Sequence, residues 1–138
     1  MLVLLCLTVI VGAVGRLHSS DLSPFPASLK WVEVGCGGGI LTESLARLGA
    51  NVLAIDAEQQ SLEAARRHSS GQAVSSLIAR RGGSITHAVQ TAEELAGLAA
   101  TDEDKLFDVV VSSEVIEHVN NPVEFARSLS SITKVREC

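Results

Sequence analysis

Residues 31–39 read Trp-Val-Glu-Val-Gly-Cys-Gly-Gly-Gly. The apolar run stops at Gly35, which predicts a buried strand that ends in a glycine loop. After the loop, apolar residues recur at helical spacing from Ile40 to Leu48, and Gly49 suits the end of a helix. Strand, glycine turn and helix form the first unit of a Rossmann-like α/β sheet. In such a unit the glycines let the backbone approach a ligand, and the helix N-terminus offers it unpaired N–H groups.

The spacing of the glycines argues against a dinucleotide. Gly35, Gly37 and Gly39 give G-x-G-x-G, and Ile40 stands where the dinucleotide fingerprint G-x-G-x-x-G has its last glycine. Glu33 places a carboxylate two residues before the loop, which would repel a pyrophosphate and attract an ammonium or sulfonium group. Glu33 with G-C-G-x-G resembles motif I of the class I methyltransferases that use S-adenosylmethionine (SAM). The alternative is a tight strand-to-helix turn without a ligand.

Composition limits the class of protein. The chain has 138 residues, a net charge of −5 and 46% apolar residues, which suits one small domain with a core. It shows no basic stripe and few aromatic residues, so we expect no nucleic-acid partner. Its three cysteines lie far apart and form neither a zinc pattern nor a disulfide framework. We interpret Cys36 as a small residue that fills the glycine turn.

Residues 1–15 are continuously apolar. They are shorter than the ~20 residues of a comfortable membrane span, and they lack the positive start of a signal peptide. They are also neither Arg-rich nor amphipathic, as a mitochondrial transit peptide would be. Three interpretations of residues 1–15 remain open: a secretory signal, an anchor, or neither. Residues 18–28 contain several Ser and Pro and are interpreted as a linker, so we expect a leader and linker over 1–28 and a partial SAM-binding domain over 29–138.

Three further strands are predicted over 51–56, 84–89 and 107–111. Asp56 ends the second strand, roughly 20 residues after Gly35, where Rossmann sites place a carboxylate that bonds ribose hydroxyls. Its alternative role is the N-cap of the following helix. Residues 91–94, Thr-Ala-Glu-Glu, predict a capping box that opens a helix.

A second cluster follows the fourth predicted strand. We expect a helical turn from Glu114, which would place Glu114, Glu117 and His118 on one face at positions i, i+3 and i+4. Two carboxylates and an imidazole just beyond the carboxyl end of a strand suggest a divalent-metal site. The alternative is a solvated acidic face on which His118 is an ordinary surface residue.

Four stretches together, over 33–50, 55–56, 92–95 and 107–119, resemble the ubiquinone biosynthesis O-methyltransferases. The resemblance covers roughly residues 29–132. It implies SAM and Mg²⁺ as cofactors and places the metal on Glu114, Glu117 and His118. In methyltransferases the loop after the third strand touches the adenine ring, which suggests residues 92–93. We therefore predict that the following residues bind SAM: Glu33, Gly35, Gly37, Asp56, Ala92, Glu93 and Ser113.

The resemblance also implies a reaction and a setting. The methyl group of SAM would pass to a phenolic oxygen of a polyprenylated phenol or catechol intermediate of ubiquinone biosynthesis. The metal would coordinate catechol oxygens, or, without a metal, His118 would act as the general base. The family implies the matrix side of the mitochondrial inner membrane, a biosynthetic protein complex as partner and peripheral contact with the membrane.

The sequence departs from the family at both ends. Residues 1–28 do not resemble the family's Arg-containing first segment, and the match stops before a Pro-Gly-Gly turn and three later strands. We therefore expect a parallel sheet in the order 3-2-1-4, without the C-terminal strands, in which residues 107–111 form an uncapped edge. Two alternative functions stay open: a class I methyltransferase with another small-molecule substrate, and a non-catalytic fragment that binds SAM.

Overall fold

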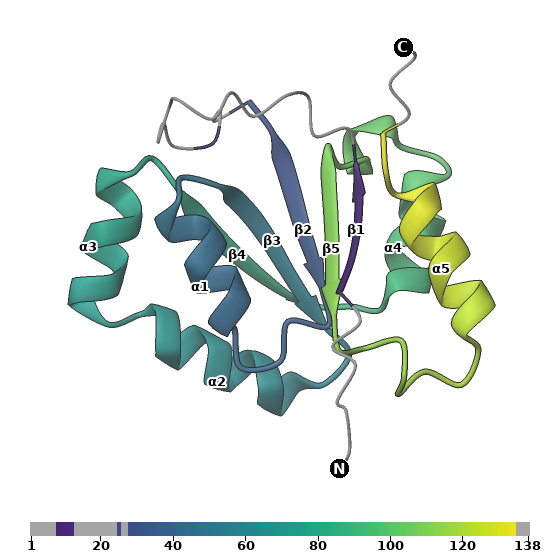
Figure 1. Cartoon of the computed structure of the whole chain (residues 1–138), viewed down its shortest axis with the longest axis horizontal. Helices are drawn as coiled ribbons and strands as arrows, with labels where there is room; N and C mark the ends of the chain where they lie inside the picture. Colours follow the sequence, from purple (N-terminus) through teal and green to yellow (C-terminus); the bar gives the residue numbers. More distant parts are fainter. Residues whose placement is uncertain (1–7, 13–24, 26–27, 135–138) are drawn as a thin grey trace.

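The computed structural model describes residues 8–12, 25 and 28–134. Five strands form one sheet in the order β1-β5-β2-β3-β4 (Figure 1). The bounds of these strands are β1 Thr8–Gly12, β2 Lys30–Val34, β3 Asn51–Asp56, β4 Ser84–Val89 and β5 Val109–Ser113. β2 to β5 run parallel, and their spatial order is the predicted 3-2-1-4 arrangement when counted from β2. The predicted fold class is confirmed: a partial Rossmann-like sheet.

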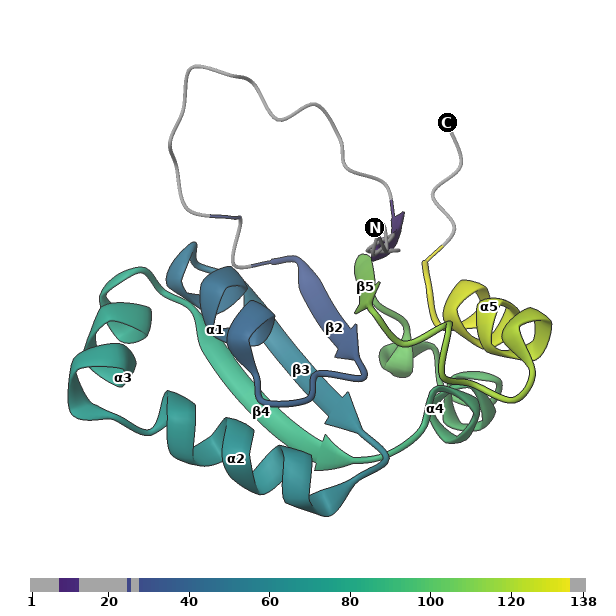
Figure 2. The same ribbon diagram turned by 60° about the horizontal axis from the view of Figure 1, so that its bottom comes forward.

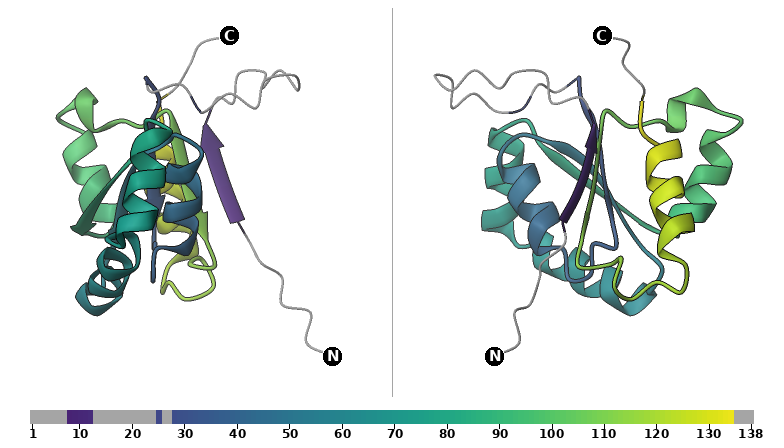
Figure 3. Two further views of the ribbon diagram at one scale, coloured as in Figure 1. Left: turned by 90° about the vertical axis from the view of Figure 1, so that its left-hand side faces the viewer. Right: turned by 45° about the vertical axis from the view of Figure 1, so that its right-hand side comes forward.

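Helices cover both faces of this sheet. Figures 1 and 2 show α1, α2 and α3 on one side of the molecule and α4 and α5 on the other. Their bounds are α1 Ile40–Arg47, α2 Gln59–Ser69, α3 Gln72–Arg80, α4 Ala92–Ala99 and α5 Pro122–Ser131, with a short 3₁₀ turn, η1, over Glu103–Lys105. Side views show the sheet as the middle layer of three (Figure 3). No helix within the described part of the chain is long and apolar enough to cross a membrane.

The core follows from the alternation of side chains along each buried strand. In β2, Val32 and Val34 face α4 and α5, where they pack with the buried Leu95 and Leu129. Trp31 faces the opposite way and packs with apolar residues near α1. Because both faces of the central strands are covered, β2, β3 and β5 are largely buried and mostly apolar, whereas β4 at the edge of the sheet is partly exposed and carries Ser84, Thr86 and His87.

Local signals set the helix ends as the sequence predicts. Thr91 and Glu94 form the reciprocal capping box at the start of α4, with hydrogen bonds of 2.9 and 3.1 Å. Asn121 caps α5 through its bond from the Glu124 N–H, and Pro122 occupies the first position, where its missing N–H is not needed.

The expectation for the fourth strand is wrong in two respects. β5 begins at Val109, because Phe107 instead forms a parallel bridge to Thr133 after α5. The edge of β5 is also covered, since β1 pairs with it in antiparallel register, from Thr8 opposite Ser113 to Gly12 opposite Val109. The apolar N-terminal stretch therefore supplies backbone partners that a bare edge would lack. The predictions for residues 1–7 and most of 13–27 lie outside the described residues.

Candidate functional site

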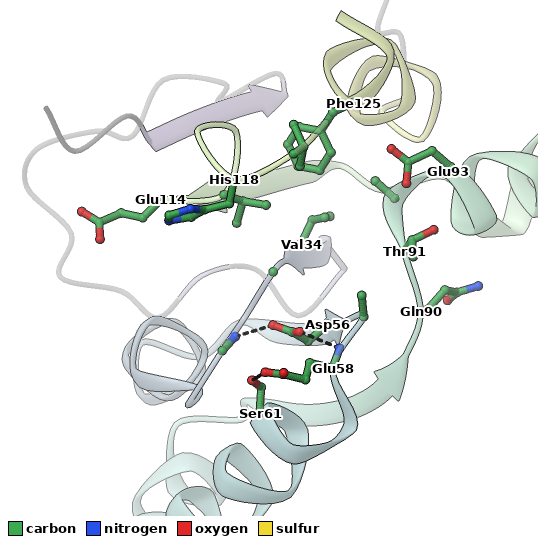
Figure 4. A pocket seen from close by; sticks show the side chains of 16 residues that line it. Val34, Asp56, Glu58, Ser61, Gln90, Thr91, Glu93, Glu114, His118 and Phe125 are labelled. Atoms are coloured by element: carbon green, nitrogen blue, oxygen red, sulfur yellow. Dashed lines mark hydrogen bonds between the residues drawn. The ribbon is translucent and has the colours of Figure 1, made fainter. Parts of the chain in front are cut away.

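A cleft of about 490 Å³ lies at the carboxyl ends of the parallel strands. Figure 4 shows the side chains that line it. They come from the ends of β2 and β3, from the loops after β2, β3, β4 and β5, and from the helices α2, α4 and α5: Val34, Gly35, Gly37, Asp56, Ala57, Glu58, Ser61, Gln90, Thr91, Ala92, Glu93, Glu114, Val115, His118, Val119 and Phe125. Open α/β sheets bind their ligands at this edge, and the volume falls in the ~300–1,000 Å³ range of small-molecule sites.

The glycine loop is tied to the neighbouring strand. The N–H groups of Gly35 and Cys36 both donate to the Ile55 carbonyl, at 2.9 and 3.0 Å. Gly35 has φ +75°, and a Cβ built there would lie 2.3 Å from Cγ2 of Val115. Only glycine therefore fits at Gly35, because both the backbone conformation and the neighbouring side chain exclude a larger residue. At Gly37, with φ +51°, the space beside Cα is open.

Asp56 organises the middle of the cleft. Its Oδ2 accepts the Gly37 N–H at 2.8 Å, and its Oδ1 accepts the Glu58 N–H at 2.9 Å (Figure 4). The carboxylate is thus held between the glycine loop and the start of α2. Each carboxylate oxygen has two acceptor positions, so both oxygens keep one for a ligand hydroxyl. Asp56 lies at the cleft, its contact with ribose stays a prediction, and its bond to Glu58 shows that it also orders the turn before α2.

Glu33 lies beneath the loop and does not line the cleft. It is 3% exposed, and its Oε2 accepts a hydrogen bond from the hydroxyl of the buried Thr42 in α1. Burial raises the pKa of Glu33 to about 7; the Thr42 bond opposes this shift and the nearby Asp56 charge adds to it. The argument that a fully charged Glu33 repels a pyrophosphate is therefore weaker than the sequence suggested.

The acidic character of the cleft instead comes from side chains that line it. Asp56, Glu58, Glu93 and Glu114 contribute carboxylates, and the described lining contains no Lys or Arg. Such a surface favours a ligand with positive charge and disfavours phosphates. This observation separates a sulfonium cofactor from a dinucleotide more clearly than Glu33 does.

The loop after β4 forms one wall. Ala92 and Glu93 line the cleft, where the adenine contact was predicted, and they stand beside Gln90 and Thr91, which sequence reasoning did not include. Glu58 and Ser61 were missed in the same way; the Ser61 hydroxyl donates to Oε2 of Glu58 at 2.8 Å. The sequence could have indicated these residues as part of the site, because all of them directly follow the carboxyl end of a parallel strand or lie in the first helical turn after it.

Burial of the Cys36 side chain agrees with its predicted role as a small turn residue. Cys36 is 6% exposed and belongs to a small apolar cluster with Ala54 and Leu62. Burial raises the pKa of its thiol to about 12, and the charges of Glu33 and Asp56 act in the same direction. A thiol held in the neutral form is a poor nucleophile, so Cys36 is not a candidate catalytic residue.

The segment after β5 differs from the prediction. Glu114 adopts φ +58°, and a short turn over residues 116–118 follows in place of a helical turn that begins at Glu114. The helical spacing that would align the two carboxylates with the imidazole therefore does not apply. Glu114 and His118 line the cleft, whereas Glu117 is exposed and is not part of the lining. Ser113 ends β5, half-buried, and is also outside the lining.

No metal-binding group is assembled in the described residues, in the sense of three or more His, Cys, Asp or Glu side chains placed to hold an ion. In Figure 4 the Glu114 carboxylate points away from the middle of the cleft, while His118 and Phe125 lie across from Asp56. As arranged here, Glu114, Glu117 and His118 do not fit a metal ion. The assignment of Mg²⁺ to them stays a prediction.

The cleft does fit SAM. Its floor offers free acceptor positions on Asp56 for ribose hydroxyls, and its carboxylates match a ligand that carries a sulfonium and an ammonium group. Val34, Val115 and Phe125 add apolar surface suited to a ring. The residues of this chain are therefore compatible with the cofactor that the glycine loop predicts.

Comparison with known proteins agrees with this geometry. The family model described as "Methyltransferase domain" matches residues 32–136. A relative in Arabidopsis thaliana, "Ubiquinone biosynthesis O-methyltransferase, mitochondrial", is 45% identical over 114 residues, which cover 83% of this chain and 31% of that protein. "Ubiquinone biosynthesis O-methyltransferase" of Parvibaculum lavamentivorans is 36% identical over 118 residues, covering 86% of this chain and 41% of that protein.

The relative of the same name in Roseobacter denitrificans is 36% identical over 121 residues, covering 87% of this chain and 43% of that protein. This chain thus spans less than half the length of each of these three relatives. The resemblance seen in the sequence motifs is confirmed by these matches. The chain belongs to the methyltransferase domain family and is related to the ubiquinone biosynthesis O-methyltransferases.

Proposed function

We propose that this chain binds SAM in the cleft and serves in methyl transfer to a phenolic oxygen of a polyprenylated phenol or catechol, an intermediate of ubiquinone biosynthesis. The observation that carries the cofactor is the Asp56 carboxylate, held by the N–H groups of Gly37 and Glu58 within a cleft whose described lining has no Lys or Arg. The names of the relatives, which give O-methylation in ubiquinone biosynthesis, support this proposal, and the polyprenylated phenol or catechol acceptor is what the family resemblance implies.

Each wall of the cleft has a distinct task in this proposal. SAM supplies, when bound, an electrophilic methyl group on a sulfonium. Asp56 accepts hydrogen bonds from the ribose hydroxyls, and its fixed position orients the cofactor without a cost in side-chain entropy. Val115, Val119 and Phe125 form apolar surface that excludes water from the reacting groups.

His118 is the candidate general base. It lines the cleft and is exposed, so its imidazole can accept the proton of a phenol that stands beside the cofactor. Glu114 lies beside it in the same loop. A role for Mg²⁺ at Glu114, Glu117 and His118 is retained as a separate proposal, and it requires that these side chains rearrange from the positions described above.

Two measurements test the function. Calorimetry of this chain with SAM, with its product S-adenosylhomocysteine and with NAD⁺ tests the cofactor, and repetition with Mg²⁺ or EDTA tests the metal. Incubation with SAM and a catechol acceptor then tests methyl transfer. Binding of SAM without transfer to any catechol or phenol would favour the alternative of a SAM-binding fragment, and transfer to an unrelated acceptor would favour a methyltransferase with another substrate.

The cellular setting is part of the same proposal. One relative is named as mitochondrial and the others described above are bacterial. We place the chain on the matrix side of the mitochondrial inner membrane, in peripheral contact with it and with a ubiquinone-biosynthesis complex. Fractionation of mitochondria with a carbonate wash and protease protection tests the compartment, and co-purification with other enzymes of the pathway tests the complex.

A further inference from the structure

Glu33 is a buried carboxyl group for which the described part of the chain provides no cationic partner. It is 3% exposed, and the hydrogen bond that the structure gives its side chain comes from the hydroxyl of Thr42, which is fully buried. Among the described residues, the ion pairs of acidic side chains involve Glu43 and Asp108, not Glu33. A single hydroxyl donor does not offset the desolvation of a carboxylate, so the neutral acid is favoured in the empty site.

The charged and titratable neighbours of Glu33 act in the same direction. Asp56 approaches it from β3 and adds a second negative charge, and Cys36 in the loop is a neutral thiol. In α1, Glu43 follows Thr42, but its charge is matched by Arg47 at 3.2 Å, and its Oε2 lies 2.6 Å from Nε2 of His68. No neighbour in this group brings an unmatched positive charge toward Glu33.

The position of Glu33 couples it to the cleft. Its side chain points to the opposite face of β2 from Val34, and the residue that links it to the cleft is Asp56, which lines the cleft and whose charge acts on Glu33. A cation bound beside Asp56 therefore offsets the negative charge that acts on Glu33, and the burial of Glu33 leaves little water to screen the effect. Such a charge favours the ionised carboxylate.

We propose that Glu33 releases its proton to solvent when SAM enters the cleft, so that cofactor binding by this chain is coupled to proton release. This inference rests on the proposed function, since it requires SAM to bind here. It gives Glu33 the role of a positioning and charge-balancing residue that acts from beneath the loop. Asp56 makes the direct contact with SAM and links the charge of the cofactor to Glu33.

Calorimetric titration with SAM at pH 7, in two buffers with different ionisation enthalpies, measures the protons released. With a pKa of about 7, Glu33 is half protonated, so we expect release of about half a proton for each SAM bound. The number should rise toward one at pH 6 and fall toward zero at pH 8.5. S-adenosylhomocysteine keeps the ammonium and lacks the sulfonium charge, so it should release fewer protons.

Two variants isolate the source of the proton. Glu33→Gln keeps the size of the side chain and an acceptor for the Thr42 hydroxyl. This variant should release no protons on SAM binding other than those that come from SAM itself. Glu103→Gln removes an exposed carboxyl in η1 outside the cleft and should release protons as the wild type does. An NMR titration of the Glu33 side-chain ¹³Cδ, which needs no variant, should show a midpoint near 7 that moves down when SAM is added.

The outcomes separate this inference from the proposed function. Saturable SAM binding with the same heat in both buffers, or an unchanged ¹³Cδ midpoint, would overturn proton coupling and leave the proposed function standing. Absence of SAM binding by the folded protein would overturn both. Proton release that persists in Glu33→Gln would assign the proton to another group and overturn the role of Glu33.

Discussion

The backbone N–H of Gly37 donates a 2.8 Å hydrogen bond to Oδ2 of Asp56, which joins the glycine loop after β2 to the end of β3. Oδ1 of the same carboxylate accepts the N–H of Glu58 at the start of α2. One side chain therefore fixes two of the loops that line the cleft. A change at Asp56 is therefore expected to alter both of these loops at the edge of the sheet.

The first prediction concerns this carboxylate. Asp56→Ala should weaken SAM binding by ~1.5–3 kcal/mol, or roughly 10- to 150-fold in Kd, because a charge-assisted hydrogen bond to ribose is lost. Calorimetry on the folded variant measures the change. Glu103→Gln, with an exposed carboxyl outside the cleft, is the control and should bind as the wild type does. Unchanged affinity of Asp56→Ala would contradict the ribose role.

The second prediction concerns the glycine at the turn. Gly35→Ala should lower the free energy of unfolding by at least ~2 kcal/mol, because alanine is strained at φ +75° and its Cβ would lie 2.3 Å from Val115 Cγ2. Gly97→Ala is the matched control, since no atom lies within 4 Å of its added Cβ inside α4. This control should be neutral or more stable by up to ~1 kcal/mol. Equal stability of both variants in urea denaturation would show that the loop adapts freely.

The third prediction is a pH dependence of stability. The folded-state pKa of Glu33, about 7, lies above its ordinary value of 4.5, so its contribution to stability is full below pH 4.5 and is lost as pH rises through 7. The Glu33→Gln variant has no titratable side chain at this position. Its stability relative to the wild type should therefore rise between pH 5 and pH 8, by up to roughly 3 kcal/mol. A difference that stays constant between these pH values, measured by urea denaturation, would show that Glu33 is ionised throughout.

The fourth prediction concerns the strand at the edge of the sheet. β1 pairs with β5 through backbone groups, and Val9 and Ile10 lie opposite Ser112 and Val111. The double change of Val9 and Ile10 to Pro fixes φ away from strand values and removes their N–H groups, which should lower the thermal midpoint and expose β5. Sedimentation should then show association of the variant, in contrast to the wild type. A variant that stays monomeric with an unchanged midpoint would mean that β1 contributes nothing to the edge.

Much of the parallel sheet could be predicted because its signals are local. The strand before Gly35, the ends of α4 and α5, and the place of Asp56 after β3 each follow from residues close together in sequence. The sheet order then follows from the family resemblance, which fixes the order of the crossovers.

The remaining features depend on contacts between distant segments. Residues 8–12 form a strand because β5 offers an edge about a hundred positions later, and an apolar run alone does not distinguish that outcome from an anchor. Glu33 is turned beneath the loop toward Thr42, a direction that the alternation of a buried strand determines only once the helices are placed. The positive φ of Glu114 breaks the helical spacing that suggested a metal site.

The central claim is that this cleft binds SAM, and calorimetric titration of the whole chain with SAM, followed by competition with S-adenosylhomocysteine and with NAD⁺, tests it most directly. We predict saturable one-site binding of SAM. S-adenosylhomocysteine should displace SAM and NAD⁺ should not, and Asp56→Ala should weaken SAM binding at least about tenfold. A folded chain that binds NAD⁺ more tightly than SAM, or that gives no heat with SAM over a range of buffers, would contradict the account.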